Sequence, residues 1–189
     1  YLEGWGLSLS EAANKRIREL GYGHPLFLRI VSMRLREISE EEALRDKAGA
    51  ELSAIERARV DLWDYLETHV YDQWNVELQE FLEAVSIVEQ FDLPLAQQIT
   101  KKKDAGRLIQ KARETGNFLI EKQKNEQTVY QLRIPMKYSM RRRLPAKLSQ
   151  DSIKELYYSA GNSYEMEGNL REALKMYEMC RNKEGISRI

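Results

Sequence analysis

Residues 81–148 constrain the fold most strongly, because β-prone runs stand there between segments of helical pattern. In order, this stretch contains an apolar helical pattern at 81–99, a second helical pattern at 104–115, β-prone runs at 118–120 and 129–132, and a basic helix at 137–147. The two β-prone runs flank a polar tip at 121–128 that contains Asn125, which predicts a hairpin. Asp104 stands where a helix N-cap is expected, and Gly116-Asn117 where a C-terminal stop is expected. Three helices with a two-stranded hairpin are the elements of a winged helix.

The composition is that of a globular protein with modest cores. Of 189 residues, 42% are apolar and 32% are charged, which fits one large domain or two to three small ones. A single cysteine cannot form an internal disulfide, so we expect a reducing, cytoplasmic setting. No stretch of roughly 18 residues is free of charge, so no membrane partner is expected. The chain opens on Tyr1 rather than Met and stops within a pattern, so we expect it to be part of a longer protein.

The net charge is zero, but the charges are distributed unevenly along the chain. Residues 101–147 hold 14 Lys or Arg against four acids, a net charge of +10, whereas residues 1–100 carry −9 and the tail from 148 carries −1. An acidic and a basic segment can dock on each other, or they can leave the basic one free for an anion. The alternative is that solvated faces of opposite sign merely adjoin.

Residues 1–74 have the pattern of a helical domain. Helices are expected at 11–20 and 26–38, joined by a glycine-rich turn. Pro25 suits the first position of the second helix, where its missing N–H has no intrahelical partner to lose. A helix N-terminus preceded by glycines such as Gly23 leaves backbone N–H groups able to contact an anion or a nucleotide. The alternative is a tight helix–helix turn without a ligand.

Two further helices are expected before residue 75. Ser39 and Glu42 have the spacing of a capping box, which starts a short helix. A long helix follows from about Leu52 to Trp74. Its apolar positions are Leu62, Trp63, Tyr65, Leu66, Val70 and Trp74. His69 lies beside this face without a Cys or second His nearby, so we expect a core or boundary histidine and not a metal ligand.

The tail carries the most specific spacing in the chain. Aromatic and small residues recur there at the offsets of a tetratricopeptide unit, in which small residues let two antiparallel helices touch and aromatics fill the gap. The matching residues are Tyr157, Gly161, Tyr164, Gly168, Ala173, Tyr177 and Cys180. Because solenoid repeats bury their faces on neighbouring repeats, we expect at least two more units to follow in the parent chain. A peptide-binding scaffold of such repeats is one functional alternative.

Direct DNA binding is another functional alternative. A winged helix that binds DNA inserts its third helix into the major groove while basic residues meet the phosphates. The helix at 104–115 would present Arg107, Gln110, Lys111 and Arg113. The remaining candidate cations are Lys137, Arg141, Arg142, Arg143 and Lys147 on the basic helix and Lys122 and Lys124 on the hairpin. The competing interpretation is that these side chains are simply solvated.

Four stretches carry a family resemblance. They are Tyr22–Arg29, similar to a Gly-x-Pro stretch; Phe81–Val88, similar to an FLLRTSIL segment; Thr115–Leu119, similar to an rrNLFL segment; and Tyr130–Arg133, similar to a YRFH strand. With them, nearly the whole chain resembles the middle of a STAND-class signal-transduction NTPase of the maltose-activator-like (MalT-like, LuxR-type) regulator family. The resemblance implies a P-loop ATPase core, a small helical domain, a winged helix, a tetratricopeptide-like sensor arm and a separate C-terminal helix-turn-helix.

The resemblance also implies a set of nucleotide contacts. In that family the proline of the Gly-x-Pro turn packs near the adenine of ATP or ADP, so Gly23 and Pro25 are the matching candidates. Arg133 stands where the family has a histidine that reaches the β-phosphate. Arginine can hold a phosphate bidentately, but it keeps its charge near neutral pH. Because the chain has no Gly-x-x-x-x-Gly-Lys-Ser/Thr loop, nucleophile–base pair or metal cluster, we expect neither catalysis nor a cofactor bound by this chain alone.

These patterns together predict a mainly α fold in three parts. They are a helical domain at 1–74, a winged helix at 75–148 and a first tetratricopeptide-like repeat at 149–189. The resemblance implies that the chain couples nucleotide state and effector binding to oligomerisation of a transcription activator. Its partners would be the parent's own ATPase domain and further repeats, a small-molecule or protein effector, and DNA through the separate helix-turn-helix.

Overall fold

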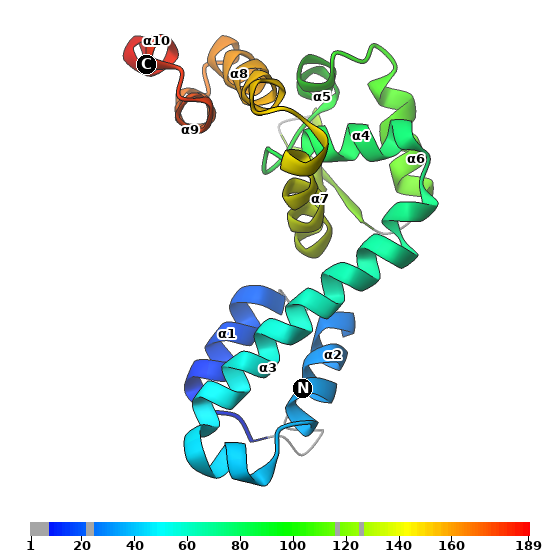
Figure 1. Ribbon diagram of the computed structural model, residues 1–189. Coiled ribbons are helices and arrows are strands. Elements are labelled where there is room, and N and C mark those ends of the chain that lie inside the picture. The colour runs from blue at the N-terminus through cyan, green and yellow to red at the C-terminus, as the bar shows by residue number, and fades with distance from the viewer. Residues whose placement is uncertain (1–7, 22–24, 116–117, 125–126) are drawn as a thin grey trace. The chain divides into compact units, whose positions relative to one another are not determined.

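The computed structural model describes residues 8–21, 25–115, 118–124 and 127–189. The chain divides into two compact units, the first ending at Gln73 and the second beginning at Trp74. Helices dominate both units, and within the described residues the only sheet is a two-stranded hairpin in the second unit (Figure 1). The predicted mainly α fold is therefore confirmed.

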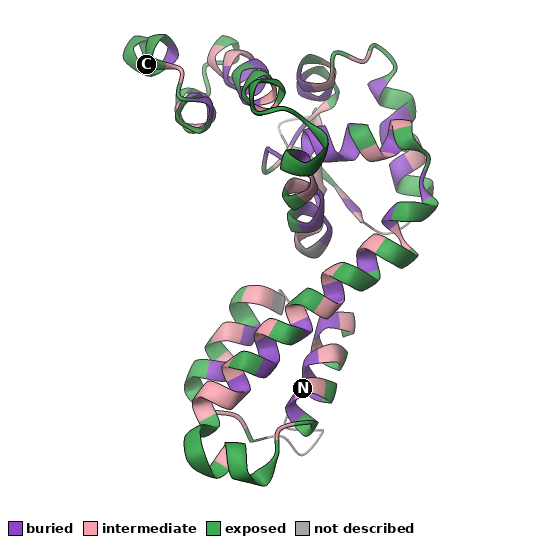
Figure 2. Cartoon of the chain, viewed as in Figure 1, coloured by how far each residue is buried: buried purple, intermediate pink, exposed green. Residues whose placement is uncertain are grey.

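The described residues of the first unit form three helices and one short 3-10 turn. They are α1 (Glu11–Gly21), α2 (Pro25–Arg36), α3 (Glu40–His69) and η2 (Tyr71–Gln73). α1 and α2 both pack against α3, and their buried residues face that helix (Figure 2). The core contains Ala13, Ile17, Phe27, Val31, Leu35, Ala54, Ile55, Ala58 and Leu62. Because these residues recur every three or four positions within each helix, each segment buries one apolar stripe.

Side-chain caps fix where two of these helices begin. The Ser10 Oγ accepts a hydrogen bond from the Ala13 N–H at 3.2 Å, which caps α1. In α3 the Ser39 Oγ accepts from the Glu42 N–H at 3.2 Å, and the Glu42 carboxylate accepts from the Ser39 N–H at 3.0 Å. The predicted capping box is therefore confirmed, and its hydrogen bonds lower the pKa of Glu42.

α3 is two helices joined at a kink. The kink lies at Asp46, whose backbone (φ −157°, ψ 84°) leaves the helical region. The Asp46 Oδ1 accepts from the Gly49 N–H at 3.0 Å, which caps the second part of the helix anew. This second part starts before Leu52 and ends at His69, so the predicted end at Trp74 was wrong. After His69 the chain continues as the 3-10 turn η2.

The buried stripe of α3 also differs from the prediction. It consists of Ala54, Ile55, Ala58, Leu62 and Leu66, together with the carboxylate of Glu51. Tyr65 and His69 lie off this stripe and are exposed, with their rings stacked at a centroid distance of 4.6 Å. The predicted core or boundary position of His69 was therefore wrong: it is the last residue of α3, beyond the last buried position Leu66, and it stacks on the exposed Tyr65 ring.

The second unit begins with the predicted winged helix. Its elements are α4 (Val76–Val85), α5 (Leu93–Thr100), α6 (Ala105–Thr115), β1 (Leu119–Lys124), β2 (Gln127–Leu132) and α7 (Ile134–Lys147). The single apolar helix predicted at 81–99 is two helices, because the chain between them pairs with the hairpin. The Phe91 N–H donates to the Tyr130 carbonyl at 2.9 Å, and the Tyr130 N–H donates to the Phe91 carbonyl at 2.7 Å. Asp92 then caps α5 by accepting from the Leu95 N–H at 2.9 Å.

The hairpin is longer than the two β-prone runs. Its register runs from Leu119 opposite Leu132 to Lys124 opposite Gln127, so the strands take up most of the predicted polar tip. The strands can extend into the polar segment because backbone hydrogen bonds do not need apolar side chains. The strand residues nearest the tip, Lys124 and Gln127, are exposed. The predicted tip residue Asn125 and the predicted helix stop at 116–117 lie outside the described residues.

The winged helix has one apolar core. α4 packs against α5, α6 and α7, which brings their buried faces together. The core residues include Leu78, Phe81, Leu82, Val85, Leu95, Ile99, Leu108, Ile109, Leu132, Met136 and Met140. An edge-to-face contact between Phe81 and Phe91, at 6.4 Å between ring centroids, ties the chain that follows α4 to this core.

Three further helices complete the second unit. They are α8 (Gln150–Met166), α9 (Leu170–Cys180) and α10 (Lys183–Arg188), and α8 also packs against α5 and α7. α8 and α9 form the predicted helix pair. At the turn between them, Gly168 has a φ of +74°, and the Asn169 N–H donates to the Tyr164 carbonyl at 2.8 Å. This is a Schellman ending, for which glycine is the residue with no steric penalty.

Of the residues predicted to pack the repeat, Gly168 does not: it is exposed at the turn, and a Cβ on it would meet nothing within 4 Å. The others lie inside the helix pair. Tyr157, Gly161, Tyr164, Ala173 and Tyr177 are all buried, and Ala173 has no exposed surface. The Tyr177 ring lies between two glycines: a Cβ on Gly161 would lie 2.7 Å from it, and a Cβ on Gly185 would lie 2.6 Å from it. The helix pair is therefore confirmed, while its assignment as a tetratricopeptide repeat stays a prediction.

We predict that Gly161→Ala lowers the free energy of unfolding by about 1–3 kcal/mol, as overpacking in a core does. The Tyr177 ring has no room to retreat, because Gly185 closes its other side. The matched control is Gly106→Ala on α6, where the new Cβ would meet only Leu93 at 3.7 Å. The control should be neutral or stabilising by up to about 1 kcal/mol. Urea denaturation measures both, and equal effects of the two substitutions would contradict this packing.

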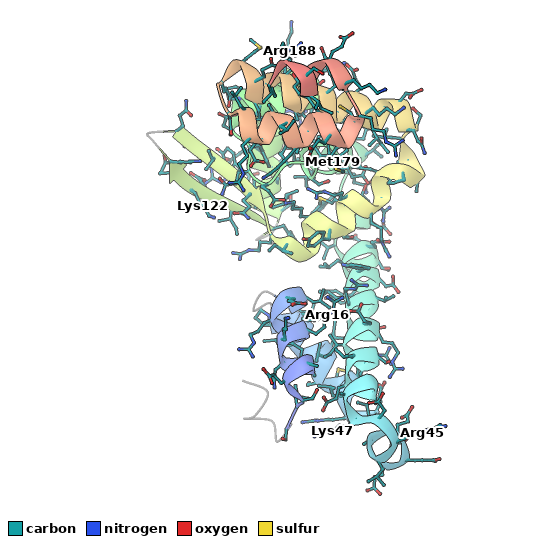
Figure 3. All side chains as sticks on the ribbon, turned by 90° about the vertical axis from the view of Figure 1, so that its left-hand side faces the viewer. Arg16, Arg45, Lys47, Lys122, Met179 and Arg188 are labelled. Carbon is teal, nitrogen blue, oxygen red and sulfur yellow. The ribbon has the colours of Figure 1, made fainter. Side chains whose placement is uncertain are left out.

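A second prediction concerns acid stability. The Glu165 carboxylate accepts from the Arg188 guanidinium at 2.6 and 2.7 Å and from the Tyr177 hydroxyl at 2.5 Å, and Arg188 is labelled in Figure 3. These bonds, Arg188 first, lower the pKa of Glu165 from 4.5 to about 2. Because the folded state holds this proton more weakly, the stabilisation is complete above about pH 5 and is lost as pH falls towards 2.

Thermal unfolding followed between pH 6 and 2.5 tests this. Glu165→Gln should lower the Tm at pH 6 and flatten its decline on acidification. The control is Glu178→Gln, at an exposed carboxylate on α9, which should leave the pH profile unchanged. A Glu165→Gln profile that runs parallel to the wild-type profile would disprove the assignment.

Candidate functional site in the winged helix

The predicted basic helix is anchored to α4 through a buried carboxylate. Glu83 lies on α4 with only 4% of its side chain exposed. Its Oε1 is 3.2 Å from the Lys147 Nζ and 3.7 Å from the Arg143 Nε, both on α7. A carboxylate buried without partners would cost several kcal/mol, so the two cations are what makes its burial possible.

Two further cations of α7 also face the domain. The Arg141 guanidinium donates to the Ser86 carbonyl at 3.1 and 2.5 Å, at the end of α4. Lys137 is buried and forms an ion pair with Glu89. Burial lowers the pKa of Lys137, and the Glu89 pair opposes that shift. Most of the positive charge of α7 is therefore used inside the domain.

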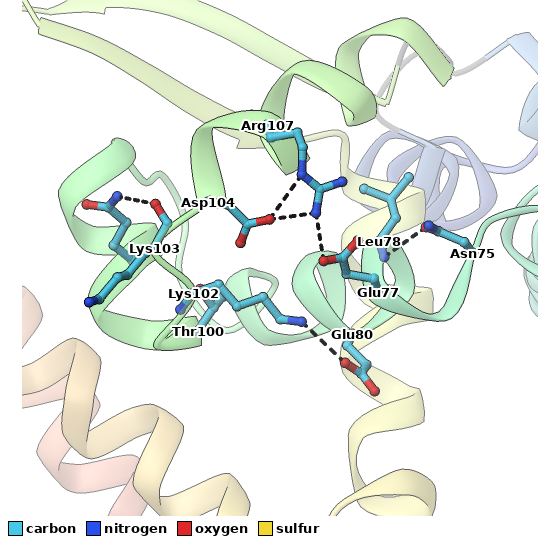
Figure 4. A network of polar contacts seen from close by, with 10 residues as sticks. Asn75, Glu77, Leu78, Glu80, Thr100, Lys102, Lys103, Asp104 and Arg107 are labelled. Atoms are coloured by element: carbon cyan, nitrogen blue, oxygen red, sulfur yellow. Dashed lines mark hydrogen bonds and ion pairs between the residues drawn. The ribbon is translucent and has the colours of Figure 1, made fainter.

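The start of α6 is held to α4 by a second polar network (Figure 4). The Arg107 guanidinium donates to Asp104 at 3.0 and 2.5 Å and to Glu77 at 2.7 Å. The Arg107 bonds lower the pKa of Asp104. The Lys102 Nζ lies 3.5 Å from the carboxylate of Glu80, which is on α4 like Glu77. This network fixes the orientation of α6, which is the helix that a DNA-binding winged helix would insert.

The candidate DNA surface of α6 keeps few free cations. Arg107 is engaged as above, Arg113 pairs with Glu121 at 2.8 Å, and the Gln110 amide donates to Glu114 at 2.7 Å. Within the described part of the chain, Lys111 alone of the four predicted residues has a side chain without a polar partner. Counted over residues 75–148, 14 cations face nine acids, a net charge of +5 instead of the +10 of the basic segment. Cations of the basic segment thus pair with acids of the preceding segment, namely Glu77, Glu80, Glu83 and Glu89.

The residues predicted to contact a nucleotide fall in different parts of the structure. Pro25 is the first residue of α2, as predicted, and is exposed in the first unit, while Gly23 lies outside the described residues. Arg133 belongs to the second unit, where it is the N-cap residue of α7. It follows β2 instead of lying within it, although its N–H still donates to the Phe118 carbonyl at 2.8 Å. A nucleotide contact shared by these residues stays a prediction.

A cavity of about 560 Å³ lies between the hairpin and the α8–α9 pair. Its walls come from the chain at 89–92, α5, both hairpin strands, the end of α8 and the start of α9. The Tyr164 hydroxyl, on α8, donates to the Gln90 carbonyl at 3.2 Å and so closes one side. Sequence reasoning did not find this cavity, because it forms between segments far apart in the chain. Tyr164 was identified only as a packing residue.

The described residues contain neither a metal cluster nor a membrane-spanning helix. No group of three or more His, Cys, Asp or Glu side chains there could hold a metal ion. None of the described helices is long and apolar enough to cross a membrane.

Helices α4, α5 and α6, the β1–β2 hairpin and α7 together form a winged helix domain, which is the first part of the second unit. Residues 67–152 match the family described as the MalT winged helix domain, so this part of the chain is a MalT-type winged helix. A search of curated proteins found no match to the chain.

We predict that Glu83→Gln lowers the free energy of unfolding by about 1–3 kcal/mol. The substitution keeps the shape of the side chain but leaves Arg143 and Lys147 facing a neutral group, and both cations can regain only part of their hydration. The matched control is Glu80→Gln, also on α4, whose exposed carboxylate pairs with Lys102 and which should change stability by at most about 0.5 kcal/mol. Chemical denaturation measures both. A Glu83 effect no larger than that of Glu80 would mean that the buried carboxylate does not anchor α7.

Proposed function

We propose that this chain is a regulatory part of a nucleotide-dependent transcription activator. In this proposal it couples nucleotide state, and effector binding in a repeat arm, to oligomerisation of the activator. The observation that carries the proposal is the match of residues 67–152 to the MalT winged helix domain. The helix pair α8–α9, packed directly against that domain through α5 and α7, supports it.

The direct contact between α8 and the winged helix suits a coupling role. Tyr164 on α8 bonds to the Gln90 carbonyl, and Lys101 at the end of α5 lies 2.9 Å from Glu155 on α8. A displacement of the helix pair would therefore disturb the chain that connects α4 to α5. Regulatory signals from a repeat arm would have a continuous packed route into the winged helix.

The nucleotide part of the proposal rests on family resemblance. In a complete parent protein, a P-loop domain would hold most of the phosphate contacts, and Arg133 would add one charge-assisted hydrogen bond. Pro25 would pack near the base. The ADP or ATP would belong to the parent protein, and this chain alone would bind either one weakly or not at all.

Sequence-specific DNA binding by the winged helix is the rival function, and the contacts described above favour it less. The cations of α6 and α7 mostly hold acids or carbonyls of the same domain. A peptide-binding repeat scaffold is a further alternative, which would need more repeats than the single helix pair described.

We predict that the chain binds DNA weakly and without sequence preference. Fluorescence anisotropy with duplexes of several sequences should give similar dissociation constants, on the order of 10⁻⁴ to 10⁻⁶ M at physiological salt, that weaken steeply as salt rises. Lys111→Ala should reduce this binding equally for all sequences. A dissociation constant in the nanomolar range for one sequence would overturn the regulatory proposal in favour of the DNA-reading rival.

The nucleotide contact is tested in the complete parent protein. There, Arg133→Ala should weaken ADP binding by about 10- to 150-fold, the value of one charge-assisted hydrogen bond of about 1.5–3 kcal/mol. Arg142→Ala, at an exposed arginine of α7, is the control and should leave ADP affinity unchanged. Isothermal titration calorimetry measures both. Unchanged ADP affinity together with a lower Tm for Arg133→Ala would show that Arg133 is structural, and the nucleotide contact would then be dropped.

A further inference from the structure

The cavity between the hairpin and the α8–α9 pair has the size of a small-molecule site. Its volume of about 560 Å³ lies within the roughly 300–1,000 Å³ range of ligand pockets. Two contacts hold its walls in place before any ligand arrives. Phe91 is fixed to β2 by two backbone hydrogen bonds with Tyr130, and the Tyr164 hydroxyl bonds to the Gln90 carbonyl. A preformed site loses little conformational entropy on binding.

The surface that this cavity offers to a ligand is mainly polar. Its large apolar side chains are almost fully buried, with Phe91 at 2% exposed, Leu95 at 3% and Tyr164 at 8%. A ligand would therefore meet charged groups and amides. The polar lining residues are Glu89, Gln90, Asp92, Lys124, Gln127, Glu167, Asn169, Arg171 and Glu172.

Four charged side chains of this lining are not used by the fold as ion pairs. Glu89 already pairs with Lys137, and Glu172 pairs with Lys175 at 2.6 Å. Among the described residues, the lining side chains without an ion pair are two acids and two cations, namely Asp92, Glu167, Lys124 and Arg171. The charge left over in the cavity is therefore balanced.

The two remaining acids lie near each other. Burial raises the pKa of Glu167, and the charge of Asp92 raises it further. One oxygen of Asp92 caps α5, which leaves its second oxygen available, and Glu167 accepts a hydrogen bond of 3.4 Å from the Ser163 Oγ. Neither Lys124 nor Arg171 lies within ion-pair distance of these acids. The cavity thus offers acids and cations that do not neutralise each other.

Three amide side chains face the same cavity and are also unused. They belong to Gln90, Gln127 and Asn169. Asn169 is the N-cap residue of α9 but makes no side-chain cap, and Gln90 is engaged through its backbone carbonyl. In the described ranges, none of the three amide groups has a polar partner. A side-chain amide both donates and accepts hydrogen bonds, so it complements another amide.

We propose that this cavity binds a short peptide with free ends, of the size of a dipeptide. Its ammonium group lies on Asp92 and Glu167, its carboxylate pairs with Lys124 or Arg171, and its peptide group meets the amides of the lining. A ligand with one charge would balance only the acids or only the cations. A neutral ligand would take water from all four charges without replacing it. The site rests on the cavity alone, so its failure would leave the regulatory proposal intact.

The test uses three probes of similar shape: dialanine, N-acetyl-dialanine, which lacks the ammonium charge, and dialanine amide, which lacks the carboxylate charge. Each is titrated into the 189-residue chain while backbone amide NMR signals are followed. Dialanine should give saturable shifts at Phe91, Val129 and Asn169. Each blocked probe should bind about 5-fold more weakly or worse, the value of one partly exposed ion pair. A blocked probe that binds as tightly as dialanine would overturn the proposal, as would the absence of saturable dialanine binding.

Two double variants assign the two charges. The acid variant carries Asp92→Asn and Glu167→Gln, in which asparagine retains the ability to cap α5, and the basic variant carries Lys124→Gln and Arg171→Gln. Each should weaken dialanine binding by about 5-fold or more, although they change the net charge in opposite directions. The acid variant should no longer prefer dialanine over N-acetyl-dialanine, and the basic variant should no longer prefer it over dialanine amide.

The control variant carries Glu178→Gln and Lys183→Gln, two exposed charges outside the cavity, and should bind as the wild type does. Circular dichroism melting curves check that all three variants fold. If the control loses as much binding as the other two variants, or if the acid variant keeps its full preference for dialanine, the lining charges do not recognise the peptide ends and the site is dropped.

Discussion

The buried carboxylate of Glu83 is the contact on which the arrangement of the winged helix depends. It faces Arg143 and Lys147, which places the C-terminal half of α7 against α4. Because a buried charge is tolerated only with partners in place, this contact admits one register of α7 and disfavours others. Arg141 on the Ser86 carbonyl and Lys137 on Glu89 extend the same pairing along the helix. The basic helix α7 was a candidate anion-binding surface in the sequence, but in the structure most of its cations hold it against the rest of the domain.

This use of charge links the fold to the function. Because the arginines of the domain pair with its own acids, fewer are available for phosphates. The domain contacts the following helices through α5 and α7. α8 packs there, and Tyr164 joins it to the chain just before α5. The junction between winged helix and helix pair is also where the cavity lies. The proposed regulatory function would use such a junction, because a ligand or a neighbouring domain can act on both elements at once.

Local patterns predicted much of this structure from the sequence. The capping box at Ser39 and the packing of Gly161 against Tyr177 follow from short-range spacing, and each was found where the pattern placed it. Gly168 was predicted to pack the repeat and instead forms the turn between α8 and α9. The break between α4 and α5 was missed, because it follows from pairing with Tyr130, far along the chain. The exposure of His69 was missed because Tyr65 beside it was taken for a buried residue.

The candidate site was less predictable for the same reason. Charge counts along the sequence showed an acidic and a basic segment. They did not show that Glu83 and Glu89 would pair with the cations of α7 within one domain. The cavity joins residues from the chain at 89–92, α5, the hairpin and the α8–α9 pair, and no local spacing marks it. Tyr164 was identified for its packing, and its position beside carboxylates of the winged helix became visible only in the fold.

A double-mutant cycle between Glu83 and Lys147 tests the central claim most directly. The free energies of unfolding of Glu83→Gln, Lys147→Met and the double variant are measured by urea denaturation and compared with the wild type. If the buried carboxylate holds α7 in place, the two substitutions should be coupled by about 1–3 kcal/mol, so that the double variant is more stable than additivity predicts. Additivity within about 0.5 kcal/mol would mean that the two side chains act independently, and would contradict the role given to Glu83.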